Sequence, residues 1–368
     1  MPDKFGLCKL GLIMKSNIVV IKIGSQLVLE NNALSEQFFD ALFTQMKHLT
    51  DKGWQPVIVL SGAVARGKAI ETLTGKHACA AFGQMELARV CAQMGEKNKV
   101  RSALILVTKD DIVNRAAYDT LQRTLAEIAH AGIVAIINEN DATTLVGVND
   151  FVDNDQLASI IALMIHADRL ILMTNVEGVF SANPETDHEA HLIAEIKNIN
   201  LEIIKRTLDG KTEHGRGGMD GKLRAARIAT AVGIETHIVK GTDPTILTDI
   251  LVSGKEQGTL CRARGRDLKD FTARERWIVS AQNSGASVQL DAGAAEAVKA
   301  RKSLLAVGIQ KVFGTFEQKE CIELLDADKE TVALGLSEIS SKRLSELLGQ
   351  KEKQYDVEVV HANNLRLL

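Results

Sequence analysis

"IVVIKIGSQLV", residues 18 to 28, carries the pattern on which the fold of this chain depends. Six residues rich in β-branched side chains, Ile18 to Ile23, run into Gly24 and Ser25 and then into a helix-like segment. Runs of this length and composition that end at a glycine are typical of buried strands. The stretch therefore predicts a strand, a tight turn and a helix.

The same pattern recurs as far as about Leu260. Five further apolar runs predict strands: "PVIVL" (56–60), "ALILV" (103–107), "IVAII" (133–137), "LILMT" (170–174) and "THIVK" (236–240). Helical patterns separate them, and the first begins after a predicted Ser35 N-cap and ends at Gly53. The alternation predicts an α/β fold with an open, mainly parallel sheet between helices. Ligands bind beyond the carboxyl ends of the strands in such sheets.

The last hundred residues follow a different pattern. A highly charged segment is followed by shorter apolar runs, broken by Gly and Asp, and by one helical pattern at Ser341–Leu348. These features predict a small β-barrel-like domain. We expect an N-terminal extension at 1–15, an α/β domain at 16–261, a linker at 262–275 and the β-rich domain at 276–368.

Composition narrows the classes of function. The 45% hydrophobic and 25% charged residues are those of a globular protein, and no apolar run approaches the roughly 18 residues of a membrane helix. Five scattered cysteines without a CxxC pair predict reduced thiols in a cytoplasmic protein and no cysteine metal site. A net charge of -3 argues against general binding to nucleic acids. We expect small-molecule partners and no membrane contact.

Three turns suit phosphate binding, and the first two directly follow predicted strands. Lys22 precedes Gly24 and Ser25, and Ser61 precedes Gly62 in "VIVLSGAVARG". Glycine lets backbone N–H groups approach a phosphate and lysine supplies a charge, although a solvated lysine and an ordinary helix N-cap explain these turns as well. The third turn, "HGRGGMDGKLRAARIA" (214–229), places four glycines before Lys222. Because ordering so many glycines is costly, the segment favours a nucleotide loop.

The stretch "IINENDATTLVGVNDFVDNDQL", Ile136 to Leu157, holds five carboxylates and four asparagines. One of them is expected to cap the following helix, either Asn154 or Asp155. The spacing does not fit an EF-hand loop. Carboxylates and amides together suit an ammonium group beside a carboxylate, which indicates an amino acid as the ligand.

In this order the motifs "VIKIGS", "LSGAVARG", "IINENDA" with "VDNDQLA", "LMTNVEGVFSANP" and "GRGGMDGKLRAA" resemble the amino acid kinase family, in its branch that phosphorylates glutamate. The later segments "RWI", "DAGAAEAV", "SLLAVGI" and "VFGTF" resemble the PUA domain. The resemblance implies an ATP- and Mg²⁺-dependent enzyme that converts the γ-carboxylate of L-glutamate to glutamyl 5-phosphate, the first step of proline biosynthesis. It also implies a homo-oligomer inhibited by proline.

The resemblance assigns roles by matching position. Lys22 and Lys222 would be catalytic, with Asp155 holding both in place. The residues implied to bind glutamate are Ser61, Asn138, Asp141 and Asn154. The residues implied to bind ATP are Lys22, Gly24, Ser25, Thr174, Asn175, Arg216, Gly217, Gly218, Met219, Asp220, Gly221 and Lys222. No side chain is assigned to the metal, since ATP oxygens and water would hold it.

Asn175 is the departure with most consequence, because the family usually has Asp there and the exchange removes a charge from the nucleotide site. Smaller departures are Gln26, Val152 and the Asn of Ala182–Pro184.

Three alternatives stay open. The first is a kinase of another small acid, such as aspartate, N-acetylglutamate or carbamate, or of UMP. The second is an RNA-binding regulator with a relict kinase domain, although residues 276–368 hold 12 Lys and Arg against 13 Asp and Glu, which predicts no RNA binding. The third is a dehydrogenase, which lacks support because the GxGxxG fingerprint is missing.

Overall fold

The computed structural model describes residues 17–144, 153–184, 186–199, 218–263, 272–280, 282–329, 331–348 and 357–367. The chain divides into two compact units, Met1–Gly265 and Arg266–Leu368. The predicted extension at 1–15 lies outside the described residues.

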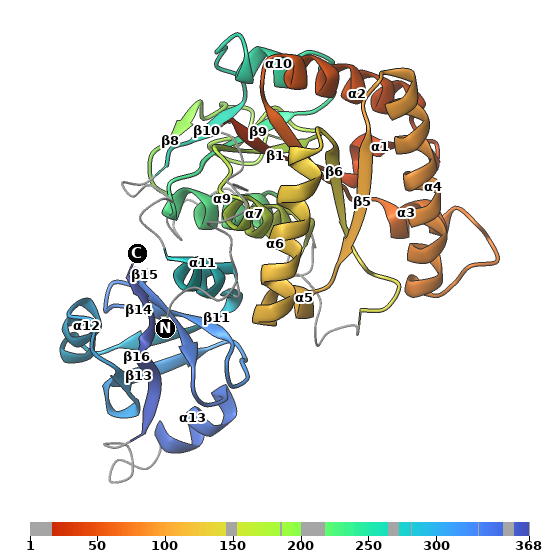
Figure 1. The fold of residues 1–368 in the computed structure, drawn as a ribbon. Helices are drawn as coiled ribbons and strands as arrows, with labels where there is room; N and C mark the ends of the chain where they lie inside the picture. Colours follow the sequence, from red (N-terminus) through yellow and green to blue (C-terminus); the bar gives the residue numbers. More distant parts are fainter. Residues whose placement is uncertain are drawn as a thin grey trace. The chain divides into compact units, whose positions relative to one another are not determined.

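The first unit is built on one eight-stranded sheet in the order β5-β6-β4-β1-β7-β9-β10-β8 (Figure 1). Its strands are β1 (Ile18–Ile23), β4 (Gln55–Val59), β5 (Ser102–Val107), β6 (Val134–Glu139), β7 (Arg169–Thr174), β8 (Glu195–Ile196), β9 (Glu235–Lys240) and β10 (Thr259–Cys261). All neighbours pair in parallel except β9 and β10. The six predicted strands and the mainly parallel sheet are confirmed. The short hairpin of β2 (Leu29–Glu30) and β3 (Ala33–Leu34) forms a separate two-stranded sheet.

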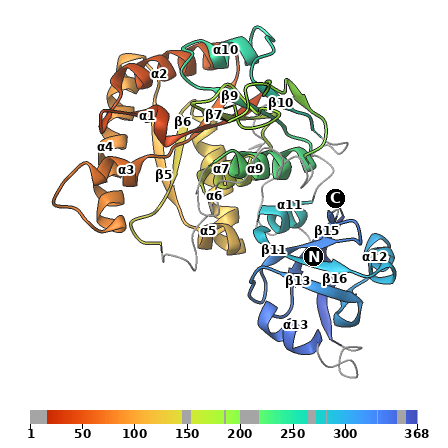
Figure 2. The ribbon, with the colours of Figure 1, turned by 180° about the vertical axis from the view of Figure 1, so that it is seen from behind.

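Helices cover both faces of this sheet (Figures 1 and 2). The described helices are α1 (Ser25–Val28), α2 (Glu36–Asp51), α3 (Ala63–Lys68), α4 (Lys76–Lys97), α5 (Lys109–Val113), α6 (Arg115–His130), α7 (Asn154–Met164), α9 (Met219–Ala231) and α10 (Ile246–Leu251). The Ser35 side chain caps α2 by accepting from the Phe38 N–H, as predicted. Among the described helices of the chain, none is long and apolar enough to cross a membrane.

Strand β1 is buried on both faces, and its alternation decides where its lysine points. Val19, Ile21 and Ile23 belong to the core formed with α2, α4 and α10. Successive side chains of a strand point to opposite faces, so Lys22 lies on the face covered by α7 and α9. The continuous apolar run of the sequence thus places one charge inside the protein.

His237 on β9 makes the stability of the first unit depend on pH. Its side chain is 8% exposed. Burial, helped by the charge of Arg169, lowers the pKa of His237 to about 4. Because the unfolded chain binds this proton near pH 6.5, stability is complete above that pH and is lost as the pH falls toward 4, by about 1.4 kcal/mol per pH unit.

We therefore expect the free energy of unfolding to drop by about 2 kcal/mol between about pH 7.5 and pH 5 because of this group alone. Urea denaturation at several pH values measures it. His237→Gln removes the titration and should flatten the profile over this range. An equally steep profile in the variant would show that other groups cause the loss.

The second unit is a curled, mixed six-stranded sheet in the order β12-β16-β15-β14-β11-β13. Its elements are α11 (Ala273–Ser280), β11 (Gln282–Leu290), α12 (Ala292–Lys299), β12 (Leu304–Leu305), a 3₁₀ turn (Ala306–Gly308), β13 (Ile309–Phe313), β14 (Cys321–Leu325), β15 (Thr331–Ser337), α13 (Ser341–Leu348) and β16 (Glu358–Leu367). Only β11 and β14 pair in parallel.

Two helices of this unit, α11 and α12, were not predicted. The expected helix at Ser341–Leu348 is α13, but α11 begins within the segment predicted as linker, and α12 was missed. α12 is rich in alanine and offers few large apolar residues to show a helical period. Its start is set by Asp291, whose side chain accepts from the Ala294 N–H.

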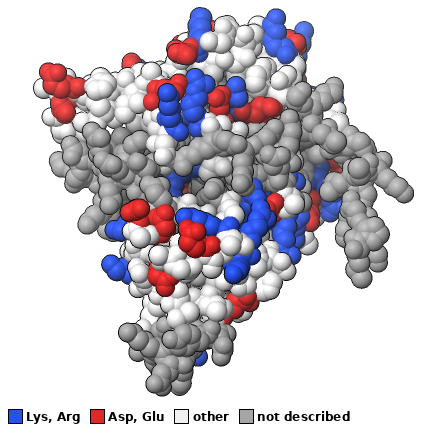
Figure 3. Space-filling view, turned by 90° about the vertical axis from the view of Figure 1, so that its left-hand side faces the viewer, with Lys and Arg blue, Asp and Glu red and all other residues white. Residues whose placement is uncertain are grey.

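Charges of both signs mix on one face of the protein. On the face in Figure 3, basic and acidic side chains lie beside one another and do not separate into broad areas. Several are paired: Arg262 contacts Glu195 at 3.0 Å and Glu235 at 3.1 Å. On this face the described side chains show no broad basic area of the kind that general nucleic-acid binders carry.

Candidate active site

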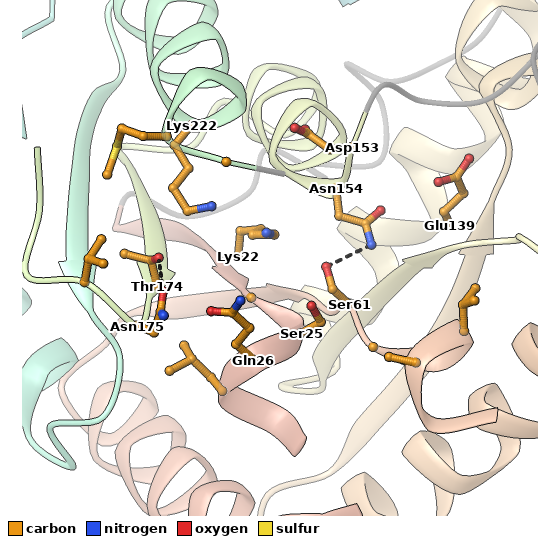
Figure 4. A pocket seen from close by; sticks show the side chains of 18 of the residues that line it. Lys22, Ser25, Gln26, Ser61, Glu139, Asp153, Asn154, Thr174, Asn175 and Lys222 are labelled. Atoms are coloured by element: carbon orange, nitrogen blue, oxygen red, sulfur yellow. Dashed lines mark hydrogen bonds between the residues drawn. The ribbon is translucent and has the colours of Figure 1, made fainter. Parts of the chain in front are cut away.

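A cavity of about 800 Å³ opens at the carboxyl ends of β1, β4, β6 and β7. The predicted site residues that line it are Lys22, Gly24, Ser25, Ser61, Asn138, Asp141, Asn154, Thr174, Asn175, Gly218, Met219 and Lys222. Figure 4 shows Lys222, Thr174 and Asn175 on one side of the cavity, with Ser61, Asn154 and Glu139 on the other. Lys22 lies between these two groups.

Two lysines share one buried carboxylate beside the cavity. Lys22 Nζ lies 2.8 Å from Asp155 Oδ1, and Lys222 Nζ lies 3.1 Å from Asp155 Oδ2. Asp155 is fully buried, whereas each lysine keeps a few per cent of its side chain exposed. A carboxylate so far from water requires charged partners. The three groups carry a net charge of +1, and the lysines present it to the cavity.

Three elements position these groups. Lys22 comes from β1, Asp155 from the first turn of α7 and Lys222 from the first turn of α9. α7 packs against both β1 and α9. α7 therefore places the Asp155 carboxylate between the ammonium groups of Lys22 and Lys222.

Asp153 caps α7, so the prediction of Asn154 or Asp155 as the cap was wrong. The Asp153 side chain accepts from the Gln156 N–H at 2.9 Å. The two other candidates are used elsewhere, because Asp155 holds the lysines and Asn154 donates across the cavity wall. Burial, together with the repulsion of Asp155, raises the pKa of Asp153.

Gly221 faces Asp153 so closely that no other residue fits without movement. A Cβ at this position would lie 2.0 Å from Asp153 Oδ2. We expect Gly221→Ala to push α9 away from α7 and to lower the free energy of unfolding by about 1–3 kcal/mol. At Gly218 a Cβ would meet nothing within 4 Å, so Gly218→Ala is the matched control. Equal thermal stability of the two variants would contradict this packing.

Asn154 and Ser61 form the opposite wall of the cavity. Asn154 Nδ2 lies within hydrogen-bond distance of Leu60 O at 2.9 Å, Ser61 Oγ at 3.0 Å and Asn138 Oδ1 at 3.1 Å. Its Oδ1 is buried and has no hydrogen-bond partner among the described residues. A buried acceptor in this state favours a ligand that brings a donor.

Asn138 supports this wall from behind. It is 1% exposed, its Oδ1 accepts from the Glu139 N–H, and its Nδ2 donates to Gln84 Oε1 at 2.7 Å. Gln84 lies on α4 and was not among the predicted site residues, because it is far from Asn138 in the sequence.

Asp141 is held by the first turn of α4. Lys76 Nζ lies 2.8 Å from Asp141 Oδ1, and the ring nitrogen His77 Nδ1 lies 2.7 Å from the Asp141 carbonyl oxygen. Lys76 and Asp141 both line the cavity, with 31% and 15% of their side chains exposed. Lys76, His77 and the cavity-lining Glu139 were also absent from the predicted site.

The remaining predicted residues surround the other end of the cavity. The Gly24 N–H donates to Met173 O at 3.2 Å, which joins the first turn to the end of β7. The Thr174 hydroxyl donates to Asn175 Oδ1 at 3.3 Å. Asp220 pairs with Arg224 and does not line the cavity, and neither does Gly221. Arg216 and Gly217 lie outside the described residues.

No group of three or more His, Cys, Asp and Glu residues in the described part of the chain is placed to hold a metal ion.

Comparison with known proteins identifies the family of each part of the chain. Residues 17–240 match the amino acid kinase family and residues 286–359 match the PUA domain. A glutamate 5-kinase of Citrifermentans bemidjiense is 33% identical over 97% of this chain and 99% of its own length. A glutamate 5-kinase of Trichlorobacter lovleyi is 34% identical over 97% and 98%. The chain belongs to the glutamate 5-kinases of the amino acid kinase family.

Among solved structures, a carbamate kinase from Giardia lamblia matches 67% of this chain and 98% of its own, with 18% sequence identity and a TM-score of 0.49. That likeness is too weak to bear on function.

Asn175 stands where the amino acid kinase family usually has Asp. Asn175 lines the cavity and its carboxamide oxygen receives only the long bond from Thr174 among the bonds described. The fold therefore accommodates the carboxamide, and its effect on nucleotide choice stays a prediction.

Proposed function

We propose that this protein transfers the γ-phosphoryl group of ATP to the γ-carboxylate of L-glutamate, giving glutamyl 5-phosphate and ADP, the first step of proline biosynthesis. The observation that carries the proposal is the pair of buried lysines on Asp155, facing a cavity with a polar, acidic opposite wall. Full-length similarity to glutamate 5-kinases supports it.

In the proposed reaction a γ-carboxylate oxygen attacks the γ-phosphorus in line, and the bond from that phosphorus to the β–γ bridging oxygen breaks. Its electron pair leaves with ADP, and no proton moves. Such a transfer is catalysed mainly by positioning and by stabilising charge on the phosphoryl oxygens. Lys22 and Lys222 would supply that stabilisation, and Asp155 would fix both ammonium groups before the substrates bind.

Mg²⁺ is proposed to arrive with ATP and to neutralise part of its phosphate charge. The group of Lys22, Asp155 and Lys222 has a net charge of +1, which suits phosphate oxygens. Gly24, Ser25 and the start of α9 at Gly218 would line the nucleotide's phosphates.

Glutamate would occupy the opposite wall. The carboxylate of Asp141 and the unpartnered Asn154 Oδ1 would accept from its ammonium group, and the Ser61 hydroxyl would donate to a carboxylate. Asn138 would act mainly by orienting Asn154. Among the alternatives, aspartate remains the closest competitor, because it carries the same head group.

The test is ADP release from the purified protein with Mg-ATP and each of L-glutamate, L-aspartate, N-acetylglutamate, carbamate and UMP, with hydroxylamine present to trap acyl phosphates. We expect a hydroxamate with glutamate alone. A hydroxamate with aspartate at equal kcat/KM would contradict the substrate assignment. No turnover with any acceptor would favour the relict-kinase alternative, and RNA binding would then be measured.

Proline inhibition, a homo-oligomer and a cytoplasmic location remain predictions that belong to this proposal.

A further inference from the structure

We propose that Lys76 and Asp141 act as one unit that recognises the α-amino-acid head group of the acceptor, with Lys76 binding its α-carboxylate and Asp141 its ammonium group. The inference rests on the proposed function and adds a specificity-determining residue to it.

The position of Lys76 is not explained by helix stability. It is the first residue of α4, and the first turn of α4 contains no acidic residue. A positive charge at a helix N-terminus is unfavourable, because the peptide dipoles already place positive charge there. Lys76 is instead directed to Asp141 across 2.8 Å, at the wall of the cavity.

The pair has the charge pattern that a zwitterionic head group needs. An α-amino acid carries an ammonium group and a carboxylate on the same carbon, so its two charges lie close together in a fixed order. An adjacent cation and anion on the protein can meet both at once, each charge facing its opposite. Lys76 Nζ lies 2.8 Å from Asp141 Oδ1, and both side chains are partly exposed at the cavity wall, where a ligand can reach them.

A second, independent feature points to a ligand at the same wall. The buried Asn154 Oδ1 has no hydrogen-bond partner among the described residues. Asn154 Nδ2 donates to Asn138 Oδ1 at 3.1 Å, and Asn138 lies on β6, the strand that precedes Asp141. The wall therefore offers Asp141 and Asn154 Oδ1 as acceptors for an ammonium group and Lys76 as a cation for a carboxylate.

Ligands that lack one half of the head group separate the two roles. 4-Aminobutyrate is glutamate without the α-carboxylate, and glutarate is glutamate without the ammonium group. We would measure Kd by calorimetry for L-glutamate, 4-aminobutyrate and glutarate on the full-length protein, with kcat and KM for glutamate as a second readout.

For Lys76→Met we expect Kd to rise about 10- to 100-fold for glutamate and glutarate, the effect of losing a hydrogen bond to a charged group, and less than about 3-fold for 4-aminobutyrate. Asp141→Asn should weaken glutamate and 4-aminobutyrate by a similar factor and spare glutarate. Lys76→Arg should restore most of the affinity for glutamate.

Two controls lie on the same helix. Lys97, in the last turn of α4, pairs with Asp40 at 2.9 Å outside the cavity, and Lys97→Met should leave all three Kd values unchanged. His77→Ala loosens the contact to the Asp141 backbone and keeps both charges, so it should affect the three ligands equally.

Equal weakening of all three ligands by Lys76→Met would show that Lys76 only holds Asp141 in place, and would overturn the proposal. Unchanged affinity for glutamate would overturn it as well. These outcomes do not depend on catalysis, so a wild-type protein that binds glutamate with this pattern but makes no hydroxamate would contradict the proposed function alone.

Discussion

Asp155→Asn is expected to lower the free energy of unfolding by about 3–5 kcal/mol and to abolish measurable turnover. The exchange keeps the shape of the side chain but removes the negative charge that lies 2.8 Å from Lys22 Nζ and 3.1 Å from Lys222 Nζ. Both lysines are about 95% buried, so their ammonium groups would repel each other with little help from water. Urea denaturation measures the loss, and ADP release measures activity.

Asp119→Asn is the matched control. Asp119 pairs with Arg115 at 2.9 Å on α6, where both side chains are more than a third exposed. An exposed pair of this kind contributes less than about 1 kcal/mol. If Asp155→Asn and Asp119→Asn denature at the same urea concentration, Asp155 is not the counter-ion on which the two lysines depend.

Lys22→Met should lower kcat by about 100- to 1000-fold, the usual effect of removing one group that stabilises transition-state charge. The KM for glutamate should stay within about threefold, because Lys22 lies between the two walls and not among the residues proposed to bind the acceptor. Steady-state kinetics at saturating Mg-ATP separates the two constants. Asp155 keeps Lys222 as a partner, so the variant is expected to fold.

Lys47→Met serves as the control, since Lys47 pairs with Asp51 on the exposed side of α2. It should leave both constants unchanged. A variant at Lys22 that kept kcat and raised the glutamate KM would assign this lysine to substrate binding and would remove it from the transition state.

The sheet of the first unit was predictable because its strands are buried on both faces. Such strands appear in the sequence as continuous apolar runs, and all six predicted runs formed strands within one or two residues. Short elements gave no such signal: β8 has two residues, and β10 has three. Their pairing with each other and with β9 depends on contacts across the fold, which local patterns do not contain.

The lysines that meet at one end of the cavity were predictable as site residues for a related reason. Lys22 and Ser61 follow apolar runs directly, and Lys222 follows a cluster of glycines, so a local pattern marks each of them. Lys76 and Gln84 are not marked in this way. They lie on a long helix and reach Asp141 and Asn138 through the tertiary fold. The predicted N-cap of α7 was wrong for another reason. Asp153, Asn154 and Asp155 are all good capping residues, and a shift of one position in the helix start decides among them.

The three charged groups Lys22, Asp155 and Lys222 are added in this order when the chain is synthesised. The chain emerges from the ribosome N-terminus first, at about 5–20 residues per second. Asp155 is therefore made when Lys22 already exists and Lys222 does not. Until residue 222 appears, the carboxylate and its first lysine cancel each other; afterwards the three groups carry a net positive charge. The site thus gains its net positive charge only after β1, β4, β6 and β7, whose carboxyl ends border the cavity, have been synthesised.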